Sequence, residues 1–365
     1  MKIALFKSKL VLLLLFISLA WSEAKAVDYA TLPFSFDGGV NDIKNTTGLS
    51  QYDLGKDYTY SPKLRFDTEG DYVILKFNST PGTLSFFIEG HGFINGSRFE
   101  IQISVNGVEY EKLAGYTSFI DDGETKTFLN IPADVRYIKW LYAKKVSGNV
   151  GLGNIRLTNT LPITLAAACT DGEKYYSTFS SGKAFTVPAD LTVSEIKVVD
   201  EKLSLATYET GDVVPANTGV MVASATSGTH NVTVTTGGSS KLGEENMLKP
   251  SGDAGITASG MNAAGMQFYR LTMHNGTEIG YWWGAAEGAA FDLAANKAYL
   301  EVSEAVASRI AGFGFTGDNE ASGVVEIQPD SQRQKANDRY DLQGRRVVNP
   351  GKGLYIINGK KFVSR

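Results

Sequence analysis

The chain has few of the residues that build catalytic and metal centres. Its 365 residues include one cysteine and three histidines. His91, His230 and His274 lie far from one another and from Cys169 in the sequence, so no two of them have the spacing of zinc ligands. A single cysteine also excludes an internal disulfide, so the fold must be stabilised by core burial. The sequence contains neither a Gly-x-Ser-x-Gly elbow nor a phosphate-binding loop.

An excess of positive charge is also lacking, since the formal net charge is −4. Residues 1–26 hold lysines, an apolar run at 10–20 and the small-residue site Ala24-Lys25-Ala26. That run is shorter than the ~20 residues that span a bilayer, so we expect a secretory signal peptide rather than an anchor. Cleavage before Val27 removes four lysines and one glutamate, which moves the formal charge from −4 to −7. No nucleic-acid partner is expected of a chain with this charge.

Residues 27–160 have the pattern of an antiparallel β-sandwich. Apolar and polar residues alternate over 84–89 and again over 99–106, which is typical of half-buried strands. Asn106-Gly107 then predicts a turn into a further strand at 108–113. Four other short strands are expected, at 72–77, 126–129, 136–142 and 154–157.

Four stretches of this region resemble a jelly-roll module that is attached to secreted Bacteroidales proteins, among them nucleases, phosphatases and glycan-degrading enzymes. They are LPFSFDGG (32–39), SPKLRFD (61–67), RYIKW (136–140) and GNVGLGNI (148–155). The module is similar to the sandwiches of carbohydrate-binding modules. The resemblance implies an N-terminal antiparallel jelly roll that serves another domain, and it implies no particular ligand.

The composition shifts toward Gly, Ala, Ser and Thr in residues 161–318, where seven further strand candidates predict a second all-β domain. YYSTF (175–179), VPANTGV (214–220) and LAANKAYL (293–300) resemble a β-rich domain near the C-termini of Bacteroidales surface proteins. Residues 319–336 are polar, apart from a short apolar interruption at 324–325, and are expected to form a linker.

The last segment, residues 337–365, has two short apolar runs and an Asn358-Gly359 hairpin signal, which predict a small β appendage. Its motifs YDLQGRR (340–346), NPGKG (349–353) and LYIINGKK (354–361) resemble tails related to type IX secretion signals. This resemblance implies an extracellular or outer-membrane location and a secretion or anchoring machinery as partner.

Two segments have the composition of a sugar site, which combines aromatic faces with amide and carboxylate groups. One is the Tyr-rich segment with Tyr52, Tyr58 and Tyr60, expected to be a loop. The other contains Trp282 and Trp283, which cannot both face the same side of a strand. Core packing is the alternative interpretation for both segments.

A structural calcium ion is a further hypothesis, because sandwich modules often hold one on turn carboxylates. The candidate ligands are Asp37, Asp42, Asp67 and Asp71, with solvated turn residues as the alternative. No other cofactor is expected. His91, in Glu89-Gly90-His91-Gly92, is interpreted as a solvated turn residue.

The sequence therefore predicts a secreted, non-catalytic protein that binds a glycan or another surface polymer. Two alternatives stay open. One is a hydrolase acting on a glycan, a nucleic acid or a phosphate ester, with its active site within 161–318, since catalytic carboxylates can lie far apart in a chain. The other is a structural adhesin that binds proteins through sheet edges or surface patches.

Overall fold

The computed structural model describes residues 28–120, 122–261, 264–307, 310–316, 320–326, 339–340, 353–357 and 360–364. The expected signal peptide at 1–26 lies outside these residues. The described chain is almost entirely β, as predicted. Its short helices are α2 (Val40–Ile43), α3 (Glu304–Ala307), η1 (Gly243–Glu245), η2 (Ala258–Met261) and η3 (Ala286–Gly288). No helix in the described part of the chain is long and apolar enough to cross a membrane.

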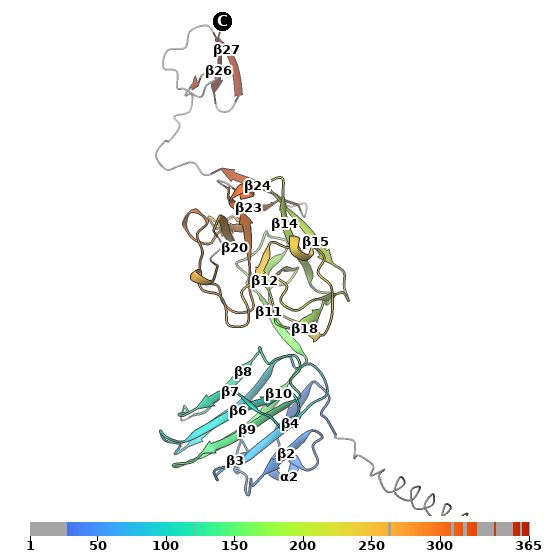
Figure 1. Cartoon of the computed structure of the whole chain (residues 1–365), viewed down its shortest axis with the longest axis vertical. Helices are drawn as coiled ribbons and strands as arrows, with labels where there is room; N and C mark the ends of the chain where they lie inside the picture. The colour runs from blue at the N-terminus through green and yellow to red at the C-terminus, as the bar shows by residue number, and fades with distance from the viewer. Residues whose placement is uncertain are drawn as a thin grey trace, which may run out of the picture.

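The N-terminal region is a sandwich of two antiparallel sheets (Figure 1). The sheet that we call the β10 sheet has the order β1-β10-β5-β8, and β3 pairs with another part of β10. Its strands are β1 (Phe34–Phe36), β3 (Leu64–Phe66), β5 (Leu84–His91), β8 (Glu124–Phe128) and β10 (Asn149–Leu157). The opposite sheet, the β9 sheet, has the order β2-β4-β9-β6-β7. Its strands are β2 (Leu49–Tyr52), β4 (Tyr72–Lys76), β6 (Arg98–Ser104), β7 (Glu111–Tyr116) and β9 (Tyr137–Lys144).

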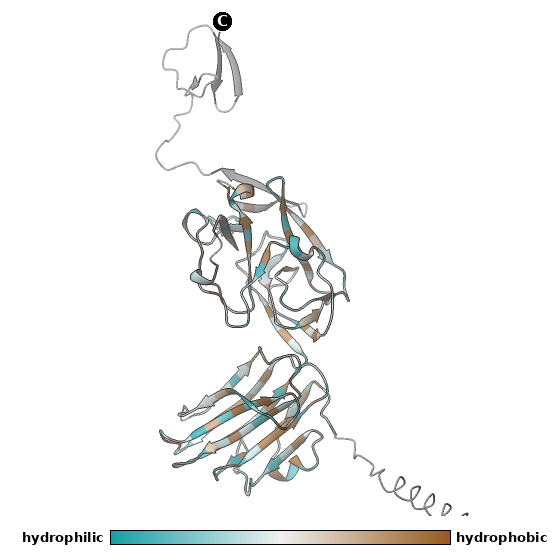
Figure 2. Ribbon diagram, viewed as in Figure 1, coloured by the Kyte–Doolittle hydropathy of each residue, from teal (hydrophilic) through white to brown (hydrophobic). Residues whose placement is uncertain are grey.

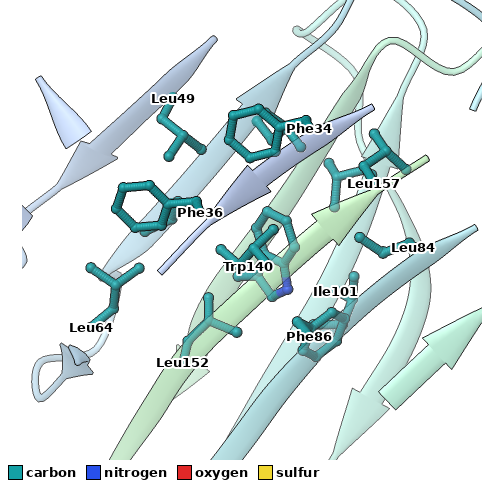
Figure 3. Packing of buried hydrophobic residues seen from close by; sticks show 14 of the residues in the cluster. Phe34, Phe36, Leu49, Leu64, Leu84, Phe86, Ile101, Trp140, Leu152 and Leu157 are labelled. Atoms are coloured by element: carbon teal, nitrogen blue, oxygen red, sulfur yellow. The ribbon is translucent and has the colours of Figure 1, made fainter. Parts of the chain in front are cut away.

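One apolar core fills the space between these sheets (Figure 3). Trp140 meets Phe86 edge-on, with ring centroids 5.6 Å apart, and Phe66 meets Phe99 in the same way at 5.1 Å. Polar and apolar residues alternate along several strands (Figure 2), and both β4 and β5 bury every second side chain, Val73 and Leu75 in β4 and Leu84, Phe86 and Ile88 in β5. The alternation in the sequence thus identified the inner face of β5 correctly and that of β6 as far as Ile103, whereas Val105, expected on the same face, lies beyond β6 and is 54% exposed. The turn after β6 is longer than predicted, because Asn106 Oδ1 accepts hydrogen bonds from the amides of Val108 and Glu109 and delays β7 to residue 111.

The second domain begins where β11 (Thr160–Leu165) leaves the sandwich (Figure 1). β11 belongs to a sheet with the order β11-β18-β13-β16, in which the other strands are β13 (Ala184–Thr186), β16 (Val213–Val214) and β18 (Gly228–Thr235). A larger sheet has the order β12-β17-β14-β15-β24-β23-β21-β20-β22-β19. Its strands are β12 (Tyr175–Phe179), β14 (Thr192–Val199), β15 (Lys202–Tyr208), β17 (Val220–Ser224), β19 (Leu248–Pro250), β20 (Met266–His274), β21 (Glu278–Trp283), β22 (Ala298–Ser303), β23 (Ile310–Thr316) and β24 (Glu320–Glu326).

The second domain extends further than its composition suggested. β24 pairs with β15 and β23, so residues 320–326 belong to the large sheet and not to the linker expected at 319–336. The apolar interruption at 324–325 was the sign of this strand in an otherwise polar segment. A separate small sheet follows, with β25 (Arg339–Tyr340), β26 (Gly353–Ile357) and β27 (Lys360–Ser364). β26 and β27 pair from Ile357 and Lys360, and Asn358-Gly359 between them lies outside the described residues.

Candidate functional site

The candidate site lies on the outer face of the β10 sheet, beneath the segment 57–63. This segment crosses β10 above two glycines. A Cβ atom on Gly151 would lie 2.8 Å from Pro62 Cγ, and one on Gly153 would lie 3.0 Å from Pro62 Cβ. Contacts of this length are absent or rare for real Cβ atoms, so these glycines leave the space that the segment occupies. The amide of Tyr58 donates to the carbonyl of Lys63 at 2.8 Å, which closes the segment into a compact loop.

Three aromatic rings gather at this position. The Tyr58 and His91 ring centroids are 4.4 Å apart, and Tyr60 stacks on Tyr58 at 5.6 Å with an interplanar angle of 26°. Tyr60 and His91 are 6.3 Å apart. Tyr60 is 54% exposed, whereas Tyr58 and His91 are half-buried beneath it. We call this group the Tyr58–Tyr60–His91 cluster, and it offers an aromatic face to solvent.

Polar side chains surround the cluster because the strands bring them to one face. His91 and Asn149 are register partners on β5 and β10, and Glu89, two residues before His91, points to the same side. Glu89 Oε1 lies 3.7 Å from His91 Nε2. The guanidinium carbon of Arg65, on β3, lies 5.6 Å from the centroid of the Tyr58 ring. The rim therefore combines an amide, a carboxylate and a guanidinium group.

Burial raises the pKa of the Tyr58 phenol to about 12, and the nearby positive charge of Arg65 offsets only part of this rise. Tyr58 therefore stays neutral in ordinary buffers, and its Oη can both donate and accept a hydrogen bond. Within the described residues, neither Tyr58 Oη nor His91 Nε2 has a hydrogen-bond partner, although the Asn149 side chain lies beside the phenol. Both atoms are buried, so they belong to the base of the cluster, and the surface that a ligand can reach is the Tyr60 ring with its polar rim.

Tyr52 does not join this cluster, although the sequence grouped it with Tyr58 and Tyr60. It ends β2 in the β9 sheet, where its ring stacks on Tyr72 at 5.4 Å with an interplanar angle of 16°. Lys139 Nζ lies 4.4 Å from the Tyr72 ring centroid on the same face. Tyr52 thus lies in the β9 sheet, whereas Tyr58 and Tyr60 lie over the β10 sheet, and the segment that holds the three tyrosines is partly strand rather than wholly loop.

Trp282 and Trp283 lie in β21 of the second domain, far along the chain from the cluster. Trp282 is buried and stacks on His274 with ring centroids 4.0 Å apart. Trp283 is half-buried, and a Cβ atom on Gly288 would come within 3.0 Å of its Nε1. Trp282 is therefore not an exposed face for a sugar, and Trp283 packs against the apolar core of the second domain.

The four carboxylates considered for calcium are engaged separately. Asp37 pairs with Arg156 at 2.6 Å, Asp42 accepts from the amide of Gly39 at 2.8 Å, and Asp67 pairs with Arg65 at 3.3 Å. Asp71 accepts hydrogen bonds from the amides of residues 67 and 68. In the part of the chain that the structure describes, no group of three or more His, Cys, Asp or Glu residues could hold a metal ion.

Buried titratable groups of the second domain mostly have structural partners. Glu195 accepts hydrogen bonds from Tyr208 Oη, from Ser240 Oγ at 2.8 Å and from the amides of residues 241 and 242 at 3.1 and 2.7 Å, which tie a loop to the sheet. One contact has the composition of a nucleophile–base pair, because Lys297 Nζ lies 2.9 Å from Ser177 Oγ. Burial lowers the pKa of Lys297. Ser177 is buried, however, so a substrate would have little access to it.

Comparisons with known proteins give no family. No family model matches the chain, and no curated protein matches it. Among solved structures, the allantoicase of Saccharomyces cerevisiae is 10% identical with a TM-score of 0.16, covering 50% of this chain and 80% of the other. The receptor-binding domain of botulinum neurotoxin type G is 8% identical with a TM-score of 0.18, covering 70% of this chain and 85% of the other. Likenesses of this size support no inference about fold or function.

The sequence pointed to Tyr58 and Tyr60 but missed the residues around them. His91, interpreted as a turn residue, is the last residue of β5 and lies against Tyr58. Arg65, Glu89 and Asn149 were not singled out. Two signals could have found the site. Glu89 and His91 are two residues apart on one strand, at positions that face outward, and the Gly151-x-Gly153 pair marks a close approach of another segment.

Proposed function

We propose that this protein is an exported, surface-displayed binding protein without catalytic activity, and that its N-terminal sandwich binds a glycan through the Tyr58–Tyr60–His91 cluster. The observation that carries the proposal is the exposed Tyr60 ring, stacked over partly buried rings and framed by hydrogen-bonding groups. A sugar ring has an apolar C–H face, which an aromatic ring can cover, and a rim of hydroxyls. The side chains of Asn149 and Glu89, which are only partly buried, could form hydrogen bonds with that rim.

The test is the binding of soluble oligosaccharides and polysaccharides to the whole mature chain, measured by calorimetry. Tyr60→Ala should weaken binding about 5- to 150-fold, the range that ~1–3 kcal/mol of a truncated contact residue corresponds to. Its matched control is Tyr52→Ala, because Tyr52 is 58% exposed and also stacked on a tyrosine, but on the other sheet. The control should bind like the parent chain.

Two results would overturn this assignment. If Tyr52→Ala weakens binding and Tyr60→Ala does not, the ligand lies on the β9 sheet. If no glycan binds, the structural adhesin becomes the better interpretation, with a protein as partner.

Surface display rests on the two ends of the chain, where residues 1–26 have the pattern of a signal peptide and residues 337–365 resemble a sorting tail. The tail would engage the secretion or anchoring machinery. Deleting residues 337–365 should change the location of the protein in cell fractions and leave the melting transitions of both domains in place. Unchanged surface display of the shortened protein would refute the role of the tail.

The hydrolase alternative now has one specific candidate, the contact between Lys297 Nζ and Ser177 Oγ. A lysine of lowered pKa can serve as the base for a serine nucleophile, and such pairs occur in acyl-transfer enzymes. The burial of Ser177 favours the structural interpretation, in which the hydroxyl satisfies a half-buried ammonium group.

A further inference from the structure

Three large aliphatic side chains are exposed at one end of the sandwich. Ile94 is 49% exposed, Ile120 is 58% exposed and Val146 is 53% exposed. They follow β5, β7 and β9, respectively, so each belongs to a different connection at the same end of the strands. Single exposed aliphatic residues are common, but three on adjacent connections form a patch.

The connections that carry these three side chains contact one another. A Cβ atom on Gly96 would lie 3.4 Å from Val146 Cγ2, and the amide of Val146 donates to Ser97 Oγ at 3.0 Å. The rings of Phe93 and Phe119, which immediately precede Ile94 and Ile120, meet edge-on with centroids 4.7 Å apart. These half-buried rings support the exposed side chains from below. We call Ile94, Ile120 and Val146 the apolar tip.

The apolar tip adjoins the proposed glycan site. His91 is the last residue of β5 and its register partner Asn149 is the first of β10, so both stand at the base of connections that form the tip. Gly92 and Gly148, the next residues outward, are in contact across the two connections. The opposite end of the sandwich is occupied, because Gly82 and Leu129 there accept hydrogen bonds from Lys183 of the second domain.

The chemistry of the tip suits a lipid layer. Its exposed side chains stand on connections at the end of the sandwich away from the second domain, where they can enter a fluid apolar phase. The exposed charges nearby are of both signs, with Arg98 and Lys144 against Glu69 and Asp122. A surface of mixed charge gives little attraction to anionic phospholipids, so recognition has to come from the head group.

We infer that this end of the sandwich binds a glycolipid, with the Tyr58–Tyr60–His91 cluster on the sugar and the apolar tip in the lipid layer. The inference rests on the proposed glycan binding and adds that the sugar is carried on a lipid. Two contacts to one molecule reinforce each other, because binding of the sugar brings the tip to the layer at high effective concentration.

The experiment compares one oligosaccharide in two forms. The sugar that binds best in the soluble panel is used free, and also coupled to dipalmitoyl phosphatidylethanolamine in phosphatidylcholine vesicles. The parent chain should bind the lipid-anchored sugar at least about tenfold more tightly than the free sugar, since even modest apolar insertion adds this much. The variant Ile94→Ser/Ile120→Ser/Val146→Ser should lose that gain and keep its affinity for the free sugar.

The matched control is Val105→Ser/Val108→Ser, which removes two aliphatic residues at least as exposed as Ile94 from the connection between β6 and β7, at the other end of β6. This control variant should still bind the lipid-anchored sugar more tightly than the free sugar. The inference fails if the parent chain binds the lipid-anchored sugar no more tightly than the free sugar, or if the triple variant of the apolar tip keeps the tighter binding. The proposed function fails separately, and earlier, if the free sugar does not bind or if Tyr60→Ala binds it normally.

Discussion

Lys183 provides a test of how the two domains are joined. It is a buried residue just before β13, and its Nζ donates to the carbonyl of Leu129 at 2.7 Å and to that of Gly82 at 3.2 Å. Both carbonyls belong to the sandwich, so an ammonium group of one domain closes the contact with the other. Burial lowers the pKa of Lys183 to about 8, and attraction by Asp253 offsets part of that fall.

The lowered pKa makes stability depend on pH in a defined direction. Between pH 8 and 10.5 the unfolded chain still carries the Lys183 proton, while the folded chain has lost it. Stability therefore rises with pH across this window, because the unfolded state binds more protons. A fall in the pKa of Lys183 from 10.5 to about 8 corresponds to about 3 kcal/mol of unfolding free energy in total. Roughly 2 kcal/mol of this change develops between pH 7.5 and 9.5.

Urea denaturation of the whole chain at several values of pH in this range measures the effect, followed by tryptophan fluorescence. The comparison is with Lys183→Met, which keeps an apolar stem without a titrating group, and with Lys202→Met, which removes an exposed lysine at the start of β15. The free energy of unfolding should rise by about 2 kcal/mol more in the parent chain and in the Lys202 variant than in the Lys183 variant. Equal slopes in all three proteins would show that Lys183 is not buried at this contact, and the reasoning would be wrong.

Two further predictions concern the domains separately. Residues 27–160 expressed alone should unfold in a single cooperative transition, because every buried residue of the sandwich core comes from this stretch; poorly dispersed amide resonances would mean that the second domain completes the core. A fluorophosphonate probe should leave Ser177 unlabelled in the native protein, because its hydroxyl is buried and bonded to Lys297, whereas labelling that Ser177→Ala abolishes would support the hydrolase instead.

The sandwich could be predicted from the sequence because some of its strands, β4 and β5 above all, have a two-residue period. Along β5 the buried residues are Leu84, Phe86 and Ile88, which are the apolar positions of the alternation. The second domain was predicted less completely. β15 (Lys202–Tyr208) has a mixed burial pattern, and β24 was hidden in a polar segment, so local periodicity gave little sign of either strand.

The candidate site shows a different limit of local sequence. Tyr52 and Tyr58 are six residues apart, yet one lies on the β9 sheet and the other over the β10 sheet. Which face a side chain joins depends on the pairing of strands that are distant in the sequence, such as β3 and β5 with β10. His91 and Asn149 are 58 positions apart and become neighbours only through that pairing. Composition could therefore suggest the aromatic residues of the site but not the polar residues around them.

The arrangement of contacts at the two ends of the sandwich bears on how a ligand would be presented. The end that meets the second domain is fixed by polar contacts: Asn130 Nδ2 donates to the carbonyl of Asp253 at 2.6 Å, and Asn296 Nδ2 donates to Asn130 Oδ1 at 3.3 Å, in addition to the bonds of Lys183. Contacts of this kind have directional geometry, so they hold one orientation better than apolar packing alone. The Tyr58–Tyr60–His91 cluster stands at the other end of the same strands, clear of these contacts. A ligand can thus bind there without disturbing the junction. Variants of the cluster should therefore change affinity without changing the pH dependence that Lys183 confers.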